Sequence, residues 1–171
     1  MERTFIAIGS NIDAESNIPK ALRLLAGSAH LIALSTFYRS DPEGDPDAPA
    51  FINGAAEIAT GQDPETLKWE LLRPIEESLG RVRSADKNAA RTIDLDLLIY
   101  GNRIIANPRL TLPDPGILHY PFVALPLLEL VPDLLLPNTS RTLREIADGM
   151  DASGLLPLGA FTASLKMEFN L

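Results

Sequence analysis

The chain lacks cysteine altogether, has only two histidines, and carries few aromatic residues, which make up 6% of its 171 positions. The absence of cysteine excludes disulfide bonds, thiolate zinc sites and cysteine nucleophiles, as expected for a reducing cytoplasm. No apolar stretch has the length needed to cross a bilayer, and the N-terminal residues lack the apolar segment of a signal peptide. We therefore expect a cytoplasmic protein with no membrane partner.

Basic residues are in the minority, because 15 Lys and Arg face 23 Asp and Glu and the formal net charge is -8. A chain this acidic is poorly suited to the phosphate backbone of nucleic acids, so we expect no nucleic-acid partner. Hydrophobic residues make up 46% of the chain, enough to bury a sizeable core without cross-links. We expect one domain over residues 1–171, present as a monomer or a weak homodimer.

Residues 91–101, RTIDLDLLIYG, predict a strand that carries two carboxylates two positions apart. Because side chains alternate along a strand, Asp94 and Asp96 share one face, about 7 Å apart. Two neighbouring like charges are costly to bury unless cations neutralise them. Oxygen ligands favour Mg²⁺, which completes its shell with substrate phosphates. The alternative is an edge strand whose carboxylates face solvent. We expect the opposite face to lie in the core, with Ile93, Leu95, Leu97 and Ile99.

A confined cluster of positive charge precedes this strand. Residues 81–91 contain four basic side chains and one acid, a local balance of +3 in an acidic chain. No helical or strand period fits the segment, so it is expected to form a loop that covers the substrates. Placed beside a carboxylate pair that binds metal, such a loop would attract phosphate groups. The alternative is a solvated charge run over a turn.

Taken together, these segments resemble the 6-hydroxymethyl-7,8-dihydropterin pyrophosphokinase family, and the resemblance covers roughly residues 3–135. The family signature is an Arg-Thr-hydrophobic-Asp-hydrophobic-Asp strand that ends in an aromatic residue and glycine, as residues 91–101 do. Supporting segments follow in the family order: FIAIGSN at 5–11, STFYRS at 35–40, FINGAA at 51–56, GRVR at 80–83, RLTLP at 109–113 and FVALPL at 122–127. The resemblance implies an α+β fold, a ferredoxin-like layered α-β-α arrangement with a central, mainly antiparallel sheet.

The resemblance also implies an enzyme of folate biosynthesis that moves pyrophosphate from ATP, its co-substrate, to the hydroxymethyl group of a pterin and releases AMP. Asp94 and Asp96 are then ligands of two Mg²⁺ ions, and they form the catalytic group together with Arg81 and Arg91. The expected contacts to ATP are Glu76, Arg83, Arg109 and Thr111. The expected contacts to the pterin are Ser40, Asp41, Pro42, Phe51, Asn53 and Phe122.

The chemistry of the pterin independently favours part of this set. A flat heterocycle with a row of donors and acceptors matches the amide of Asn53, and Phe51 and Phe122 are suited to stack on its faces. The alternative for both phenylalanines is a place in the core. Asn53 is harder to explain in that way, because a buried amide in an apolar strand needs polar partners.

Three departures from the family pattern concern the rim of the expected site. Residues 88–90 read Asn-Ala-Ala where the family has Trp-Gly-Pro, Asp114 replaces a histidine between two prolines, and Tyr120 replaces an arginine. Asp114 would repel phosphate unless its side chain turns outward or binds another group. These departures leave a second hypothesis open, namely a catalytically weak or inactive homologue that binds pterin or nucleotide.

Periodicity predicts the remaining elements. Apolar residues at helical spacing predict a helix from about residue 18 to Gly27, with Pro19 in its first turn. They predict another from Pro64 to Leu79, with Asp63 as its N-terminal cap. Pro74 predicts a kink in the second helix near Leu71, after which Glu76 would face the catalytic strand. Residues 108–115 are expected to form a loop and 122–130 a helix. Apolar residues alternate over 161–169, a pattern typical of a strand that joins the sheet or a second copy.

Overall fold

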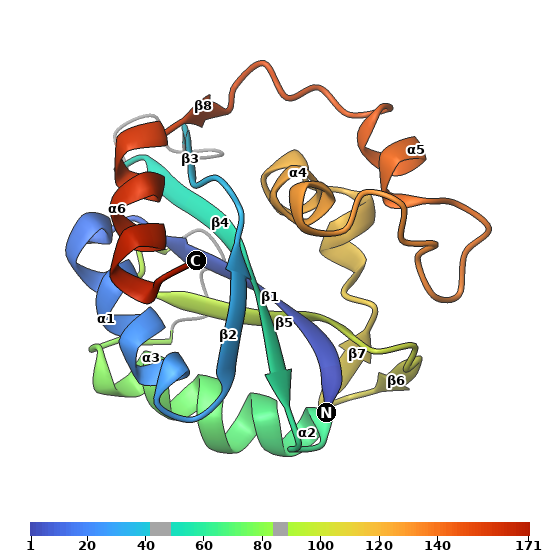
Figure 1. Ribbon diagram of the computed structural model, residues 1–171, viewed down its shortest axis with the longest axis horizontal. Coiled ribbons are helices and arrows are strands. Elements are labelled where there is room, and N and C mark those ends of the chain that lie inside the picture. The colour runs from blue at the N-terminus through green and yellow to red at the C-terminus, as the bar shows by residue number, and fades with distance from the viewer. Residues whose placement is uncertain (42–48, 84–88) are drawn as a thin grey trace.

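The computed structural model describes residues 1–41, 49–83 and 89–171, and its centre is one antiparallel sheet (Figure 1). Within these ranges the sheet has six strands in the order β5-β1-β4-β3-β8, and β2 also pairs with β4. Every pairing between neighbouring strands in this sheet is antiparallel. The strands are β1 (Glu2–Ser10), β2 (His30–Leu34), β3 (Tyr38–Ser40), β4 (Phe51–Thr60), β5 (Asp94–Tyr100) and β8 (Leu156–Pro157).

The order of the strands has the ferredoxin-like topology that was expected. β2 pairs with residues 56–59 of β4 and β3 with residues 51–53, so the two form successive segments along one edge of β4. If β2 and β3 are counted as one strand, the chain runs β-α-β-β-α-β. The first strand, β1, then lies between the third, β4, and the fourth, β5. The prediction of an α+β fold with a mainly antiparallel sheet is confirmed.

Helices cover both faces of this sheet (Figure 1), which confirms the predicted α-β-α layering. One face packs against α1 (Ala14–Ala26), the helix formed by α2 (Pro64–Thr66), the π-helical segment η1 (Leu67–Leu72) and α3 (Arg73–Ser78), and α6 (Gly159–Phe169). The other face packs against the 3-10 helix η2 (Pro115–Leu118), α4 (Pro121–Leu130) and α5 (Leu143–Ala147). None of the helices in the described ranges is both long enough and apolar enough to span a membrane.

α1 buries the apolar stripe that its sequence predicts, and Gly27 follows its last residue. The buried side chains include Ile18, Leu22 and Leu25, at helical spacing. The expected position of Pro19 was wrong. Because the helix already begins at Ala14, Pro19 lies in its interior rather than in the first turn.

The helix from Pro64 to Ser78 begins as predicted, since the Asp63 side chain accepts hydrogen bonds from the backbone of Glu65 and Thr66, both at 3.1 Å. It contains an irregularity where a kink near Leu71 was predicted. The segment before Pro74 is π-helical, and such wider turns are a common way to accommodate a break in the α-helical bonding. After this segment Glu76 is buried and contacts β5, as expected.

β5 carries the carboxylates on one face and apolar residues on the other, but the alternation does not extend to its end. Ile93, Leu95 and Leu97 lie in the core beneath α1, as predicted. Ile99 was placed on the same face and instead joins Leu98 in the core beneath α4. The reason is a bulge in the pairing with β1, in which Phe5 pairs with Ile99 and the next residue pairs with Leu97.

Two further predictions of local structure were wrong. Residues 161–169 lie in α6 and not in a strand, so neither an added edge strand nor a strand-mediated dimer follows from them. Phe161, Leu165 and Phe169 are also four residues apart, which places them on one face of a helix, and all three contact the core. The expected loop at 108–115 contains β7 (Leu110–Leu112), which forms a hairpin with β6 (Ile105–Asn107).

Gly54 in β4 provides a test of how tightly the sheet packs beneath its helices. A Cβ at this position would lie 2.6 Å from the ring of Phe37, which is fully buried and packs edge-on against Phe161. We expect Gly54→Ala to lower the free energy of unfolding by about 1–3 kcal/mol, because a buried ring cannot move aside. Gly61→Ala is the matched control, since its Cβ would meet nothing within 4 Å. Denaturant unfolding measures both, and equal stabilities would contradict this account.

Candidate active site

The register of three adjacent strands brings predicted metal and pterin residues to one place. Gly9 of β1 pairs with Asp94 of β5 on one side and with Asn53 of β4 on the other. Directly paired residues point to the same face of a sheet, so Asp94 and Asn53 face the same side across the glycine. A cavity of about 70 Å³ opens there, lined by Ala7, Ile8, Gly9, Asn53, Gly54, Asp94, Asp96, Phe122 and Val123.

Asp94 is held by two arginines from the preceding segment. One carboxylate oxygen accepts a hydrogen bond from Nη1 of Arg81, and the other accepts one from Nη1 of Arg91 at 2.7 Å. Burial works to raise the pKa of Asp94, but the charges and hydrogen bonds of Arg81 and Arg91 outweigh it and hold the pKa below its ordinary value. Asp94 is therefore ionised at neutral pH.

Asp96 has the opposite surroundings. In the described part of the chain its carboxylate takes part in no hydrogen bond or ion pair, although it lies one strand repeat from Asp94. Burial, followed by the charges of Asp94 and Asp114, raises the pKa of Asp96 to about 6, while the charges of Arg73 and Lys68 oppose this rise. Among the described residues, the site thus combines one neutralised carboxylate with one that has no direct partner.

The side chain of Glu76 joins α3 to β5 from within the core, where it is 1% exposed. It accepts hydrogen bonds from the backbone N–H of Leu95 and from Arg73 at 2.8 Å each, from Arg81 at 2.9 Å and from Arg83 at 2.5 Å. Burial raises the pKa of Glu76 to about 7 against the Leu95 N–H and the arginine charges, which lower it. Glu76 thus holds Arg73, Arg81 and Arg83 together, and its expected contact to ATP stays a prediction.

The amide of Asn53 fits into the sheet because position 9 has no side chain. A Cβ on Gly9 would lie 2.7 Å from Asn53 Oδ1. Asn53 Nδ2 donates to the Ser40 hydroxyl at 3.2 Å, so two of the predicted pterin residues contact each other. Asn53 is half-buried at the edge of the cavity, and its donor and acceptor atoms remain suited to the edge of a heterocycle.

The two phenylalanines proposed to hold the pterin have different surroundings. Phe122, in the first turn of α4, lines the cavity and stacks on Tyr120, with ring centroids 5.1 Å apart and an interplanar angle of 21°. Phe51 begins β4 on the same face as Asn53, and the guanidinium of Arg91 lies 5.7 Å from its ring centroid. Neither is fully buried, so the alternative of two core residues does not describe them.

Asp114, which replaces the usual histidine, is turned toward a helix end. Its Oδ1 accepts a hydrogen bond from the backbone N–H of Gly116 at 2.7 Å and caps η2. Burial raises the pKa of Asp114, and the Asp94 charge adds to the effect, whereas the Gly116 N–H and Lys68 oppose it. Asp114 therefore adds negative charge near Asp96 and has a structural partner of its own.

The other expected ATP residues lie on the hairpin β6–β7, which is packed beside β5. Arg109 contacts the Trp69 ring, 5.4 Å from its centroid, and lies 3.9 Å from a Glu65 oxygen. Thr111 is exposed on β7. No hydrogen bond or ion pair within the described ranges joins either residue to the carboxylate pair. Asp41 is exposed after β3, and Pro42 and residues 84–88 of the expected covering loop lie outside the described residues.

Several contributors to this region were not predicted. Arg73 and Lys68 both act on the charge of Asp96, and both lie close to Trp69, at 5.4 and 5.5 Å from its ring centroid. The spacing of Arg73 three residues before Glu76 was the available signal, since such pairs meet on a helix. The need for glycine at position 9 can be recognised only once the register of β1 with its two neighbours is known.

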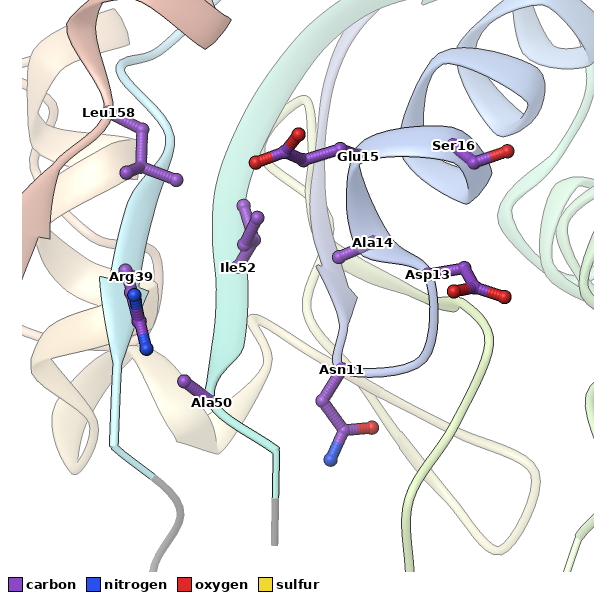
Figure 2. Close-up of a pocket in the computed structure, with 9 residues that line it drawn as sticks. All are labelled: Asn11, Asp13, Ala14, Glu15, Ser16, Arg39, Ala50, Ile52 and Leu158. Carbon is purple, nitrogen blue, oxygen red and sulfur yellow. The ribbon is translucent and has the colours of Figure 1, made fainter.

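A larger cavity of about 500 Å³ lies on the opposite face of the sheet, beside the start of α1 (Figure 2). Arg39 and Ile52, which pair with each other across β3 and β4, line it together with Ala14 and Glu15. Ile52 follows Phe51 and precedes Asn53, so it faces away from the carboxylate pair. Among the residues that the structure describes, none of those predicted to bind metal or pterin lines this larger cavity.

The donor atoms around Asp94 and Asp96 fit a hard divalent cation that is shared with a phosphate ligand. Two carboxylates of one strand line one cavity, and that of Asp96 takes part in no hydrogen bond or ion pair in the described part of the chain. Within the described ranges, no group of three or more acidic, His or Cys side chains could hold a metal by itself. Mg²⁺ commonly takes one or two carboxylates and completes its shell with water and phosphate oxygens.

The contrast between the two carboxylates predicts that replacing each with asparagine has opposite effects on the stability of the protein. The folded-state pKa of Asp96, about 6, exceeds the ordinary value, so the folded state binds this proton more tightly and loses stability as pH rises toward 6. We expect Asp96→Asn to raise the free energy of unfolding of the metal-free protein at pH 8 by on the order of 1–2 kcal/mol, and to change it little at pH 4.

Asp94→Asn is the matched comparison. The lowered pKa of Asp94 contributes stability that is present at neutral pH and is lost as pH falls through the folded-state pKa. Asp94→Asn is therefore expected to destabilise the protein at pH 8. Urea unfolding with a chelator at pH 4, 6 and 8 measures both variants. Destabilisation of the same size by both substitutions at pH 8 would contradict the assignment.

The chain matches a family model described as 7,8-dihydro-6-hydroxymethylpterin-pyrophosphokinase (HPPK) over residues 5–132. It is 40% identical over 154 residues to the 2-amino-4-hydroxy-6-hydroxymethyldihydropteridine pyrophosphokinase of Haemophilus influenzae, covering 86% of this chain and 95% of that protein. The Pseudomonas aeruginosa protein of the same name is 36% identical over 158 residues, covering 91% of this chain and 96% of the relative.

Solved structures agree on the fold. Wild-type Plasmodium falciparum HPPK-DHPS with SDX-DHP superimposes with a TM-score of 0.69 at 14% identity, covering all of this chain and 45% of the longer one. The same wild-type protein in a second structure gives a TM-score of 0.68 at 13% identity, covering 99% and 46%. This chain thus spans less than half of those proteins, and the likeness shows the fold. On the family match and the bacterial relatives, the chain belongs to the 7,8-dihydro-6-hydroxymethylpterin-pyrophosphokinase family.

Proposed function

We propose that this protein transfers pyrophosphate from ATP to the hydroxymethyl group of 6-hydroxymethyl-7,8-dihydropterin, with AMP as the second product. The observation that carries the proposal is the single cavity at which Asp94 and Asp96 meet Asn53 and Phe122. Membership of the family supplies the reaction, and the cavity supplies a place where a metal-bound triphosphate and a heterocycle would meet. We further propose that the reaction serves folate biosynthesis in the cytoplasm.

The arginines around Asp94 and Glu76 are proposed to bind the triphosphate. Arg81 and Arg91 hold Asp94, and Arg83 holds Glu76 while nearly half of the Arg83 side chain is exposed. Planar guanidinium groups match phosphate oxygens as well as they match carboxylates. When the nucleotide binds, Arg81, Arg83 and Arg91 would move their hydrogen bonds partly from carboxylates to phosphates, and negative charge on Asp94 would be released toward the cavity.

Asp94 and Asp96 are proposed to hold two Mg²⁺ ions together with the phosphates. The bound cations would neutralise the phosphates and lower the pKa of the acceptor alcohol. The carboxylates of this chain would orient the β-phosphate toward the cavity, and Asp96, which has no competing hydrogen bond in the described ranges, is the more available ligand. Arg109 and Thr111 on the hairpin β6–β7 are proposed to contact the nucleotide from the opposite rim.

The pterin is proposed to lie against the face of β4 that carries Phe51 and Asn53, with Phe122 of α4 on its other side. Asn53 and the Ser40 hydroxyl, which already contact each other, would form hydrogen bonds with the donors and acceptors on the edge of the pterin. Its hydroxymethyl oxygen would then attack the β-phosphorus and lose its proton to solvent, the bond from that phosphorus to the α,β-bridging oxygen would break, and AMP would leave with that oxygen. Catalysis would come mainly from positioning and electrostatics, as is usual in phosphoryl transfer.

The central experiment measures AMP formed from ATP and the pterin alcohol in the presence of Mg²⁺. We expect the wild-type protein to form AMP, and Asp94→Ala and Asp96→Ala each to lower the rate by about 10³-fold or more, because each removes an oxygen ligand at the reacting phosphates. Asp148→Ala, an exposed carboxylate after α5, is the control and should retain full activity. Circular dichroism checks that the variants fold.

Two results would change this proposal. Turnover retained by both carboxylate variants would refute the metal assignment. Wild-type protein that binds ATP and pterin but forms no AMP would support the alternative of a non-catalytic homologue. The activity is proposed for the chain as a monomer or weak homodimer, without a nucleic-acid or membrane partner.

The role of Asn53 can be separated from that of the nucleotide residues. Asn53→Ala is expected to weaken pterin binding by about 10- to 100-fold, because a ligand group in the cavity loses its hydrogen-bond partner. Binding of a non-hydrolysable ATP analogue should change by less than about twofold, since no nucleotide contact is assigned to this residue. Isothermal titration of each ligand measures both effects. An equal loss of affinity for the two ligands would show that the substitution acts on the fold.

A further inference from the structure

We propose that Asn11 is a positioning residue that fixes Arg91 in the active site by holding both of its backbone polar groups. This inference rests on the proposed function, because Arg91 is assigned there to the triphosphate. Asn11 follows the last residue of β1, is 4% exposed, and carries an uncharged side chain that does not line the cavity with Asp94 and Asp96.

Two hydrogen bonds join Asn11 directly to Arg91. The side-chain Oδ1 of Asn11 accepts from the backbone N–H of Arg91 at 2.7 Å. The backbone N–H of Asn11 donates to the carbonyl of Arg91 at 3.1 Å. Asn11 therefore binds both the N–H and the C=O of Arg91. This pair of bonds fixes the point at which the Arg91 side chain leaves the backbone.

These bonds attach Arg91 to the end of β1 beyond the point where the regular pairing of β1 with β5 stops. The pairing of β1 with β5 ends with Gly9 opposite Asp94, and residues 91–93 do not belong to the strand. Ser10, which is fully buried, donates from its hydroxyl to the carbonyl of Thr92 at 2.6 Å. Ser10 and Asn11 thus extend the attachment to the start of the motif by three residues, without a regular ladder.

The side chain of Arg91 needs such an anchor because it bridges two parts of the site. Its Nη1 donates to Asp94 at 2.7 Å, and its guanidinium lies 5.7 Å from the centroid of the Phe51 ring. The carboxylate belongs to the proposed metal site and the ring to the proposed pterin face. A shift of the Arg91 backbone would therefore misplace its positive charge relative to both substrates, and small displacements of catalytic groups are costly in rate.

The same amide also contacts the segment that leads to Phe51. Asn11 Nδ2 donates to the carbonyl of Pro49 at 3.4 Å, two residues before β4 begins. Figure 2 shows Asn11 where the chain leaves β1 and turns into α1, with its side chain directed away from the helix. Asn11 thus lies between the approaches to Phe51 and Arg91, and the two bonds to Arg91 are the shorter contacts.

Asn17 offers a matched control in the same turn. Its side chain is 8% exposed, and its Nδ2 donates to the carbonyl of Ile12 at 2.8 Å. Within the described part of the chain, it forms no hydrogen bond with Arg91 or Pro49. Replacing either asparagine with alanine removes one buried amide near the end of β1, so the two variants share a general cost in stability. Ile12, the partner of Asn17, donates its own N–H to the Arg91 carbonyl at 3.3 Å, and both variants retain this backbone donor. The variants differ in that Asn11→Ala removes the side-chain acceptor of the Arg91 N–H.

The kinetic test compares Asn11→Ala with Asn17→Ala. We expect Asn11→Ala to lower kcat for AMP formation by about 30- to 100-fold, and Asn17→Ala to stay within about threefold of wild type at a similar loss of Tm. Asn11→Ala combined with Arg91→Ala should be no slower than Arg91→Ala alone, because a residue that acts through Arg91 has nothing left to position. Equal kcat losses in the two asparagine variants, or additive losses in the double variant, would overturn the proposal.

A second test does not depend on activity. Hydrogen exchange of the Arg91 amide in the ligand-free protein should become at least about 10-fold faster in Asn11→Ala and remain unchanged in Asn17→Ala, since the side chain of Asn11 accepts from that N–H and the side chain of Asn17 donates to Ile12. Unchanged exchange in Asn11→Ala would overturn the proposal whatever the kinetics show. If the wild-type protein forms no AMP, the proposed function fails, and the exchange experiment still decides whether Asn11 fixes Arg91.

Discussion

A balance between carboxylates and guanidinium groups at the start of β5 holds the functional end of this molecule together. The carboxylates are Glu76, Asp94 and Asp96, and the guanidinium groups belong to Arg73, Arg81, Arg83 and Arg91. A carboxylate as deeply buried as Glu76 is tolerated only because several donors surround it. Those donors come from α3, from the segment after it and from β5 itself, so a single buried charge joins all three.

The same balance suits the anionic ligand that we propose for this site. Arginines paired to carboxylates are already oriented, and Arg73, Arg81 and Arg91 are also largely buried. They can share their hydrogen bonds with phosphate without a new fold. The two aspartates are also unequal, since Asp94 is neutralised by two arginines and Asp96 has no direct partner in the described ranges. One carboxylate thereby maintains the local structure, and the other is the one that we propose as the more available ligand for a cation.

Much of this arrangement could be predicted from the sequence because it depends on local patterns. The alternation in β5, the Asp63 cap and the apolar stripe of α1 each follow from one periodicity or one preferred residue type. The predicted contact of Glu76 with β5 also holds, through the backbone N–H of Leu95, and its other partners are arginines. The roles of Gly9 and Asn11 depend on the register between β1 and its neighbours, which no local pattern contains.

The errors share a related cause. The alternating residues at 161–169 satisfy a strand period and also place Phe161, Leu165 and Phe169 on one helical face, and only packing against the core decides between the two. Ile99 changed faces because a bulge in the pairing with β1 shifted the register, and the sequence of β5 alone carries no sign of it. Tertiary context thus decided each of these elements.

The surroundings of Trp69 have a spectroscopic consequence. The side chains of Lys68, Arg73 and Arg109 all lie within 5.5 Å of its ring centroid, and the chain has a single tryptophan. Indole emission from this protein therefore arises at one place, beside cations whose charges extend toward Asp96. Any polyanion that draws these cations toward itself changes the electric field at the indole, so the protein contains its own fluorescent reporter of occupancy at this rim.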